Sequence, residues 1–524
     1  MSRMWLKRTA KIIKKTMPIS RKENIKRNLR FGMIEKAVVL IVPFITNTLL
    51  IRNLGIEYAG IGNVFKAITG ILLIGNLGFE EAVISCMYKA FAEEDKQTIS
   101  AYVHHFKRLY RKIGCVVVLL SIMTLPFLPY ITRHSELSKT INIYICFAMY
   151  LSEGLIKYFF SGHLRTVPVA DQKIRLLNSI TVITLLAKCI LQCFFLTKMR
   201  SYYLYLLVIP IITLIYDSLV RYSVYKAYPY LRMPAELDDN AVDMLNQKIK
   251  GVVIHHFAGK TRNETDSLCV SAFIGLTAAG IYGNYMQIIS GLSVVFSAIS
   301  DALTPSVGNS LSLETEDKNF RDMNKIDFIY ISLSSIAAVC LLCLFQPFMY
   351  MWMGQDLMLE NSSVVAFTVL FYLLRLGDIR YIYIKALGLW YETRYLSVLE
   401  MLSNIALNIY LCKNYGVTGI IFATIISVFF FNYISFPIVL FKTYFKTASI
   451  YTYFWEHIKY SLVTIISAAI CWHICLSIPY VVFSATGVMY WLSRMLVCTI
   501  VTLILYTIAF RKKISQSIRE IFPC

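Results

Sequence analysis

Apolar stretches of about 20 residues recur along almost the whole chain, and each could cross a hydrocarbon core of about 30 Å as a helix. Spanning segments have to be helical because lipid offers the backbone no hydrogen-bond partner. Hydrophobic residues make up 57% of the 524 residues and charged residues 16%, and the mean hydropathy of +0.59 excludes a water-soluble globule. We therefore predict an all-α integral membrane protein with about fourteen transmembrane helices. The predicted spans start near Phe31, Gly62, Gly114, Ile141, Leu176, Tyr203, Gly251, Gly280, Phe328, Val364, Tyr395, Gly419, Tyr460 and Gly487.

The distribution of basic residues predicts the orientation in the membrane. An even number of spans puts both termini on one side, and Lys and Arg are concentrated in the segments of that side. This asymmetry over short loops predicts that both termini are cytoplasmic. Residues 1–30 carry eleven Lys or Arg against one acid, Glu23, among scattered apolar residues. This pattern favours a helix bound to anionic membrane lipids over a nucleic-acid partner, despite the net charge of +21.

A long polar cytoplasmic connection divides the chain into two lobes. We predict a basic cytoplasmic segment at 1–30, an N-lobe of helices 1–6 at 31–225, and an inter-lobe loop at 226–250. A C-lobe of helices 7–12 follows at 251–445, and helices 13–14 with a cytoplasmic tail occupy 446–524.

The two lobes also resemble each other in sequence. Leu54–Ile61 reads Leu-Gly-Ile-Glu-Tyr-Ala-Gly-Ile, and Ile274–Ile281, 220 residues later, reads Ile-Gly-Leu-Thr-Ala-Ala-Gly-Ile. A weaker echo occupies Tyr415–Ile420. Each of the two main copies ends an odd-numbered span, which predicts a parallel repeat of two six-helix lobes with the last two helices outside it. The alternative is a chance likeness between glycine-rich hairpins.

Ionisable residues inside predicted spans are the candidate site, because a charge at mid-bilayer has to face a cavity or a partner. They are densest in the seventh span, where i, i+4 spacing predicts pairs of Lys260 with Glu264 and of Arg262 with Asp266. Either the two charges of each pair neutralise each other, or the two cations contact an anionic substrate. A phosphate would suit the second alternative, because the planar arginine fork can make two hydrogen bonds to it. The candidate substrate-binding residues are Lys260, Arg262, Asp266, Glu264, His256, Asn263, Arg375 and Arg380.

A second set of ionisable residues could line the cavity or couple transport to an ion. It consists of Lys66, Glu80, Glu81, Glu153 and Lys157. On one continuous helix Lys66 and Glu80 would lie about 21 Å apart, which excludes them as partners. Motifs for nucleotide binding, zinc hydrolysis or a catalytic triad are missing from the sequence, so we expect no catalytic residue and no cofactor beyond coupling to H⁺ or Na⁺. Cys471 and Cys475 flank His473, but without a matching second pair we interpret them as packing residues and expect no metal.

The residues of the seventh span resemble a known family. Thr261–Tyr285, together with Leu54–Ile61, Ala302–Asn309 and Met353–Gly354, is similar to bacterial Wzx-type polysaccharide flippases. These belong to the multidrug/oligosaccharidyl-lipid/polysaccharide exporter superfamily. The resemblance implies that an undecaprenyl-pyrophosphate-linked oligosaccharide crosses from the cytoplasmic to the outer leaflet of the bacterial cytoplasmic membrane. The product would be capsule, O-antigen or exopolysaccharide, with a polymerase and export machinery as further partners.

Within this resemblance Asn263, Thr265 and Asp266 match the family pattern, whereas Lys260 and Arg262 stand where relatives more often carry apolar residues. The departure implies either an unusually anionic sugar or a different way of holding the pyrophosphate. Two other functions stay open. One is an ion-coupled exporter of small compounds, in which Glu80, Glu81 or Glu153 would carry the ion. The other is a membrane-embedded polysaccharide polymerase, for which the expected large, Arg-bearing outer loop is missing from the sequence.

Overall fold

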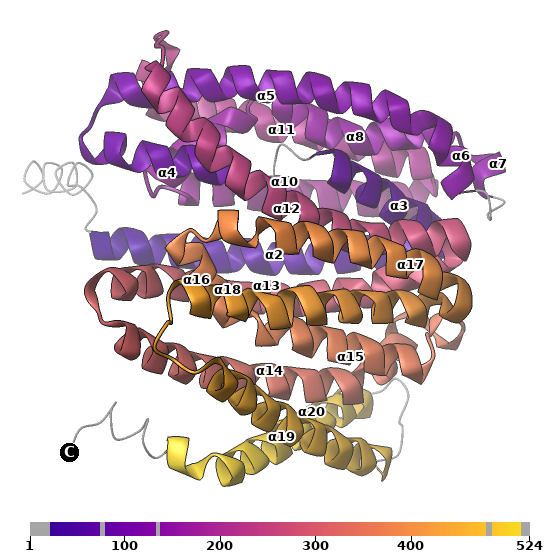
Figure 1. Cartoon of the computed structure of the whole chain (residues 1–524). Helices are drawn as coiled ribbons and strands as arrows, with labels where there is room; N and C mark the ends of the chain where they lie inside the picture. Colours follow the sequence, from indigo (N-terminus) through magenta and orange to yellow (C-terminus); the bar gives the residue numbers. More distant parts are fainter. Residues whose placement is uncertain (1–20, 74–78, 133–136, 478–484, 515–524) are drawn as a thin grey trace, which may run out of the picture. The chain divides into compact units, whose positions relative to one another are not determined.

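A computed structural model of the chain describes residues 21–73, 79–132, 137–477 and 485–514, and its elements in these ranges are helical (Figure 1). Among them, ten helices are long and apolar enough to cross a membrane, or eleven if the bent pair Ile143–Phe159 and Gly162–Ala170 is one span. The predicted all-α membrane architecture is confirmed, whereas the count of fourteen is not. Most of the predicted basic segment, residues 1–20, lies outside the described residues, and residues 21–30 belong to the helix Arg21–Leu54.

Four of the predicted spans, the second, the seventh and the joined eleventh and twelfth, reduce the number from fourteen to the eleven counted with the bent pair. The second is broken into two shorter helices, α3 (Ile56–Leu72) and α4 (Phe79–Ala92). The distance of Lys66 from Glu80 therefore cannot be taken along one helix, and that premise was wrong. The seventh is a helix, α12 (Asp239–Phe273), but its ionisable residues leave it without a sufficiently apolar stretch. α12 also begins inside the 226–250 segment expected to be a loop, and the other lobe boundaries stay predictions.

The predicted eleventh and twelfth spans are joined without an intervening loop. The backbone inside α17 (Trp390–Ser427) is non-helical at Gly416, where φ is 58° and ψ is −139°. Asn404 nevertheless donates a 3.0 Å hydrogen bond to the Thr424 hydroxyl. Residues twenty apart on one straight helix would lie about 30 Å apart, so the chain turns back at Gly416. Two helices, as predicted, therefore lie within the stretch Trp390–Thr443 that reads as one continuous span.

The described chain divides into two compact units, which we describe separately. Among the described residues, the first comprises 21–46, 80–116 and 152–245, and the second comprises 47–73, 79, 117–132, 137–151, 246–477 and 485–514. α2 (Arg21–Leu54), α5 (Lys96–Thr124), α8 (Ile143–Phe159) and α12 contribute residues to both. In addition to α4, the first unit contains η3 (Gly162–Arg165), α9 (Thr166–Ala170), α10 (Arg175–Phe194), η4 (Phe195–Met199), α11 (Tyr202–Ala227) and η5 (Pro229–Arg232).

In the first unit α10 packs along α11, and the Gln192 side chain donates to the Tyr205 carbonyl at 3.3 Å. The rings of Phe106, Tyr110 and Tyr158 form a buried aromatic group with successive centroid distances of 4.3 and 5.2 Å. The core of this unit is therefore largely aromatic where α5 faces α8.

The second unit is built around α14 (Glu316–Met353), which packs against α15 (Asn361–Leu376), α19 (Ile450–Ser477) and α20 (Ala485–Ala509) (Figure 1). α17 packs against α15 and continues through the π-helical η7 (Val428–Ile434) into α18 (Ser435–Thr443). The remaining elements of this unit, besides α3, are η2 (Leu125–Phe127), α6 (Leu128–Ile131), α7 (Leu137–Thr140), α13 (Leu276–Leu313), η6 (Gln355–Leu357) and α16 (Asp378–Leu387).

The two copies of the sequence repeat start their helices in the same way. Gly55 and Gly275, 220 residues apart, have φ of 111° and 129° and directly precede α3 and α13. Glycine reaches such positive φ without steric cost, which explains why both copies carry it. The same register relates two buried ring pairs. Phe65 lies 5.7 Å from Phe147 and Tyr285 lies 5.8 Å from Phe367.

α3 and α13 also pack against each other through these copies. A Cβ added at Gly60 would lie 2.0 Å from the Leu276 carbonyl oxygen, and one at Gly280 would lie 2.7 Å from the Ile56 carbonyl oxygen. Because each residue is exchanged with its repeat equivalent, this is one contact made twice, as at a two-fold interface. Only glycine allows membrane helices to approach so closely.

The contact predicts a steric effect of replacing either glycine. Gly60→Ala should push α3 from α13 and lower the free energy of unfolding by about 1–3 kcal/mol, the usual cost of an overpacked site. Gly308→Ala on α13 is the matched control, because a Cβ there meets no atom within 4 Å. Thermal unfolding of the purified protein in detergent measures both. Equal melting temperatures for the two variants would contradict the close approach.

Candidate functional site

A cavity of about 720 Å³ in the second unit gathers most of the charged residues predicted to bind substrate. We call it the charged cavity. α12, α13, α15, α16, α17 and η7 contribute to its wall. Its ionisable and amide lining residues are His255, His256, Lys260, Arg262, Asn263, Glu264, Arg375, Asp378, Glu400 and Asn432.

Each of the three cations in this wall is paired with an acid. Lys260 lies 2.5 Å from Glu264, which confirms the i, i+4 pair expected on α12. Arg375 lies 2.8 Å from Asp378 across the junction of α15 and α16. The third pair joins Arg262 on α12 to Glu400 on α17. The wall of the charged cavity therefore carries as many negative as positive side chains.

The predicted pair of Arg262 with Asp266 was wrong, because the two side chains face different neighbours. Asp266 is buried, and its carboxylate accepts hydrogen bonds from Asn408 at 2.7 Å, Thr424 at 3.0 Å and Tyr282 at 3.1 Å. These partners are neutral, and Asp266 is outside the lining of the charged cavity. The side-chain oxygen of Asn408 belongs to the same group. It is also buried, and it accepts no hydrogen bond from the described part of the chain. A small cation is the ligand that such an oxygen cluster would suit.

Arg380 is the second predicted residue outside the cavity lining. It is 2% exposed and donates to the Asn432 side-chain oxygen at 2.8 Å and to the Tyr433 carbonyl at 3.3 Å. Its guanidinium packs against Gly377, where an added Cβ would lie 2.6 Å from it. Arg380 thus lies directly behind the wall. The six other predicted residues, His256, Lys260, Arg262, Asn263, Glu264 and Arg375, line the cavity.

The structure places most of the predicted coupling residues in the first unit, whereas the charged cavity is lined by residues of the second. There Glu80 accepts a 2.9 Å hydrogen bond from the Tyr110 hydroxyl, and Glu153 pairs with Lys157 at 3.0 Å. Glu81 is exposed in the same unit. Lys66 is exposed on α3 of the second unit and does not line the charged cavity.

Sequence reasoning missed the serines of the cavity wall. Ser290, Ser293 and Ser297 on α13 line the charged cavity together with Ser267 and Ser397. The first three recur at i, i+3 and i+7, which places them on one helix face. A serine stripe in an otherwise apolar span was the available signal. Hydroxyl groups of this kind can donate to the oxygen atoms of a sugar or a phosphate.

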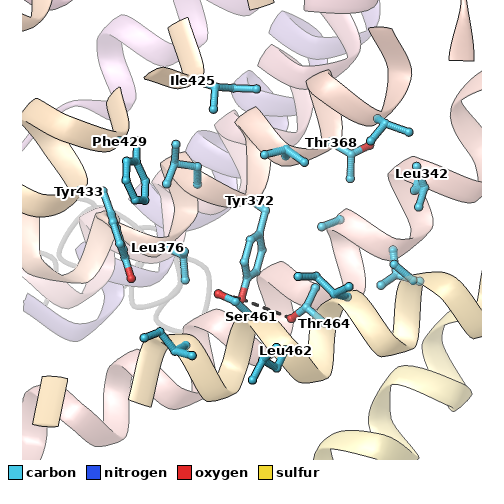
Figure 2. A pocket seen from close by; sticks show the side chains of 18 of the residues that line it. Leu342, Thr368, Tyr372, Leu376, Ile425, Phe429, Tyr433, Ser461, Leu462 and Thr464 are labelled. Atoms are coloured by element: carbon cyan, nitrogen blue, oxygen red, sulfur yellow. Dashed lines mark hydrogen bonds between the residues drawn. The ribbon is translucent and has the colours of Figure 1, made fainter. Parts of the chain in front are cut away.

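A second cavity of the same unit is almost entirely apolar and has a volume of about 800 Å³ (Figure 2). We call it the apolar cavity. Its wall comes from α14, α15, α17, η7 and α19, with Leu342, Ile425 and Phe429 among the lining residues. The few polar groups bond to one another, since the Tyr372 hydroxyl accepts from Thr464 at 3.3 Å.

The two cavities lie on opposite faces of α15. Leu374 and Arg375 line the charged cavity, whereas Tyr372, Leu373 and Leu376 line the apolar one. η7 repeats the arrangement, with Asn432 in the charged wall and Tyr433 in the apolar wall. The segments α15 and η7 therefore separate the charged cavity from the apolar cavity.

Comparisons with known proteins agree with this architecture. Residues 12–310, more than half of the chain, match the model of a family described as polysaccharide biosynthesis protein. A search of the curated proteins returned no match. Among solved structures, the chain is similar to the lipid II flippase MurJ in an inward closed conformation, with 16% identity and a TM-score of 0.68 over 93% of this chain and 100% of that one.

Two further similar structures are MATE transporters. An inward-facing multidrug resistance MATE family transporter of the MOP superfamily has 11% identity and a TM-score of 0.63 over 80% of this chain and 99% of that one. A mutant of the Vibrio cholerae MATE transporter VcmN has 14% identity and a TM-score of 0.59 over 80% and 97%. At these identities the likeness shows that the chain has the fold of MOP-superfamily transporters.

Proposed function

Because the chain belongs to the family of polysaccharide biosynthesis proteins, we propose that it is a flippase for a lipid-linked oligosaccharide. Its substrate would be an undecaprenyl-pyrophosphate-linked sugar, moved from the cytoplasmic to the outer leaflet of a bacterial cytoplasmic membrane by alternating access. Both termini would lie in the cytoplasm. The observation that carries the proposal is the pair of unlike cavities on the two faces of α15.

The chemistry of such a substrate suits this pair of cavities. Its pyrophosphate is anionic and would exchange the acid partners of Lys260, Arg262 and Arg375 for its own oxygens. Its sugar hydroxyls would bond to the serines and Asn263 of the same wall. Its polyprenyl chain is apolar and would lie against the aliphatic and aromatic wall of the apolar cavity.

The three ion pairs also suggest why so many charged side chains are tolerated in the cavity wall. Removing the acid partner of Arg262 or Arg375 would leave a largely buried guanidinium uncompensated, which is strongly destabilising, whereas the paired state is neutral. The phosphate of the substrate would take the place of an acidic side chain beside the same cation. Binding would then release Glu264, Glu400 or Asp378 instead of creating a new charge in the protein.

One prediction of the proposed function concerns the ion pair on α12. Lys260→Gln/Glu264→Gln keeps the net charge of the cavity but removes the lysine that would contact phosphate. In a strain lacking the native gene, surface polysaccharide should fall by about tenfold or more, since a hydrogen bond to a charged group contributes about 1.5–3 kcal/mol. Lys318→Gln/Glu314→Gln removes an i, i+4 pair on the same unit outside both cavities and is the matched control.

Polysaccharide is measured together with the amount of protein in the membrane. The control variant should support the wild-type level of polysaccharide. Wild-type polysaccharide from the Lys260→Gln/Glu264→Gln variant at wild-type protein level would refute substrate binding by Lys260.

Another prediction of the proposed function concerns the apolar cavity. Ala468 on α19 lines it, whereas the neighbouring Ala469 is exposed and does not. Ala468→Phe should fill part of the space and weaken binding of a polyprenyl pyrophosphate to the purified protein by about tenfold. This is the loss expected when about two buried CH₂ groups of about 0.8 kcal/mol each are displaced. Ala469→Phe should bind as the wild type does, and equal affinity of the two variants would exclude the apolar cavity as the tail site.

The energy source is a separate part of the proposal. Asp266 is a buried carboxylate held by the neutral residues Asn408, Thr424 and Tyr282, unlike the paired acids of the charged cavity. We propose that it binds the coupling cation, either H⁺ or Na⁺, because a buried carboxylate whose hydrogen-bond donors are neutral is stabilised by either. Asp266 would then act beside the charged cavity and not in contact with the substrate.

This role predicts a specific loss in Asp266→Asn, which keeps the size of the side chain. In proteoliposomes, an imposed gradient of one of the two cations should accelerate translocation by the wild type and leave Asp266→Asn unaffected. Asp356→Asn in η6, outside both cavities, should respond as the wild type does. An unchanged response in Asp266→Asn, or a wild type that responds to neither gradient, would contradict the coupling role.

A further inference from the structure

Five of the twelve described cysteines gather in one place on the second unit. α14 contributes Cys340 and Cys343, α19 contributes Cys471 and Cys475, and α20 contributes Cys498. On α14 and α19 the spacings of i, i+3 and i, i+4 turn both thiols of a pair to the same helix face. The Cys498 thiol interacts with those of Cys340, Cys343 and Cys471. Three helices therefore direct their thiols toward one point.

The separation of these thiols has the size of a metal site. The sulfur atoms of Cys343, Cys475 and Cys498 all lie within 4.8 Å of one another, and those of Cys475 and Cys498 lie 4.0 Å apart. With metal–sulfur bonds of about 2.3 Å, a trigonal site places its three sulfurs about 4.0 Å apart. The distance between the Cys475 and Cys498 sulfurs thus already fits. The two distances to the Cys343 sulfur need only small side-chain rotations.

We propose that Cys343, Cys475 and Cys498 bind one thiophilic metal ion, Cu(I) or Zn(II), that joins α14, α19 and α20. Thiolates are the ligands that select these two ions. On binding, each of the three thiols loses its proton to water, and three metal–sulfur bonds form without oxidation or reduction. The buried thiol of Cys471 interacts with that of Cys498 and is the candidate for a fourth ligand, which Zn(II) prefers.

The surroundings of the thiols suit a bound metal thiolate. All three ligands are buried, at 4%, 3% and 0% exposure, so water does not compete for the ion. Arg494 lies one turn before Cys498 on α20, and its guanidinium donates to the Cys475 carbonyl oxygen. This cation offsets the negative charge that three thiolates bring to a low-dielectric region.

From the sequence we expected no metal at Cys471 and Cys475, because no matching second pair accompanies them. His473, which stands between them, has its side chain exposed on the other face of α19. The missing ligands instead come from Cys343 and Cys498, which are 132 residues before and 23 residues after Cys475. The metal would fasten the two C-terminal helices, which lie outside the predicted repeat, to α14.

The test is metal binding by the full chain, purified in detergent under reducing conditions. Cu(I) and Zn(II) are each titrated in competition with a coloured chelator, and one equivalent of either ion per chain should resist the chelator. Cys343→Ser/Cys498→Ser should weaken this binding by at least about tenfold, because it removes two ligands of the ion. Cys189→Ser/Cys193→Ser is the matched control, since those thiols lie 3.9 Å apart as neighbours on the single helix α10, and it should bind as the wild type does.

X-ray absorption by the loaded protein provides a readout that does not depend on the variants. A sulfur shell at about 2.3 Å supports the site. The proposal is overturned by chelator-sensitive metal in the wild type, by a shell of nitrogen and oxygen only, or by equal losses in the two double variants. If the double variant does not fold, Cys343→Ser alone replaces it, with the same expected loss of affinity.

Discussion

Compensation of buried charge is the constraint on which the second unit depends. Hydrocarbon offers an ionised group neither water nor a counter-ion, so each charge inside a bundle of membrane helices has to meet a partner in the protein. Arg262 meets Glu400, and Arg375 meets Asp378, so these contacts fix how α12, α15, α16 and α17 surround the charged cavity. The cavity is consequently neutral when empty and still rich in groups that bind anions.

Glycine packing and the partition formed by α15 complete the account. The contact of Gly60 and Gly280 with the opposite backbone sets how closely α3 approaches α13, and any opening between these helices has to separate them. α15 exposes Arg375 to one cavity and Tyr372 to the other, so a substrate with an anionic head and an apolar tail could occupy both sides of one helix. This arrangement connects the chemistry of the family's lipid-linked sugars to particular residues of this chain.

The sequence predicts what is local along a helix and not what helices bring together. Hydropathy predicted the membrane architecture, and i, i+4 spacing predicted the pair of Lys260 and Glu264. Glu400 lies 138 residues from Arg262, so no spacing rule could find that partner, and a nearer acid, Asp266, was chosen wrongly. The apolar cavity left no signal because its wall has the composition of any lipid-facing surface. The thiol cluster was missed because its cysteines come from three helices, and no spacing rule could bring them together.

Binding of matched lipids to the purified chain tests the central claim most directly. A polyprenyl pyrophosphate and the polyprenol of the same length differ only in the group assigned to the charged cavity. We predict that the pyrophosphate binds about tenfold or more tightly, as charged hydrogen bonds of about 1.5–3 kcal/mol each imply, and that added salt reduces the difference. Equal affinity for the two lipids at low salt would contradict the proposal that the cations of the charged cavity bind the substrate.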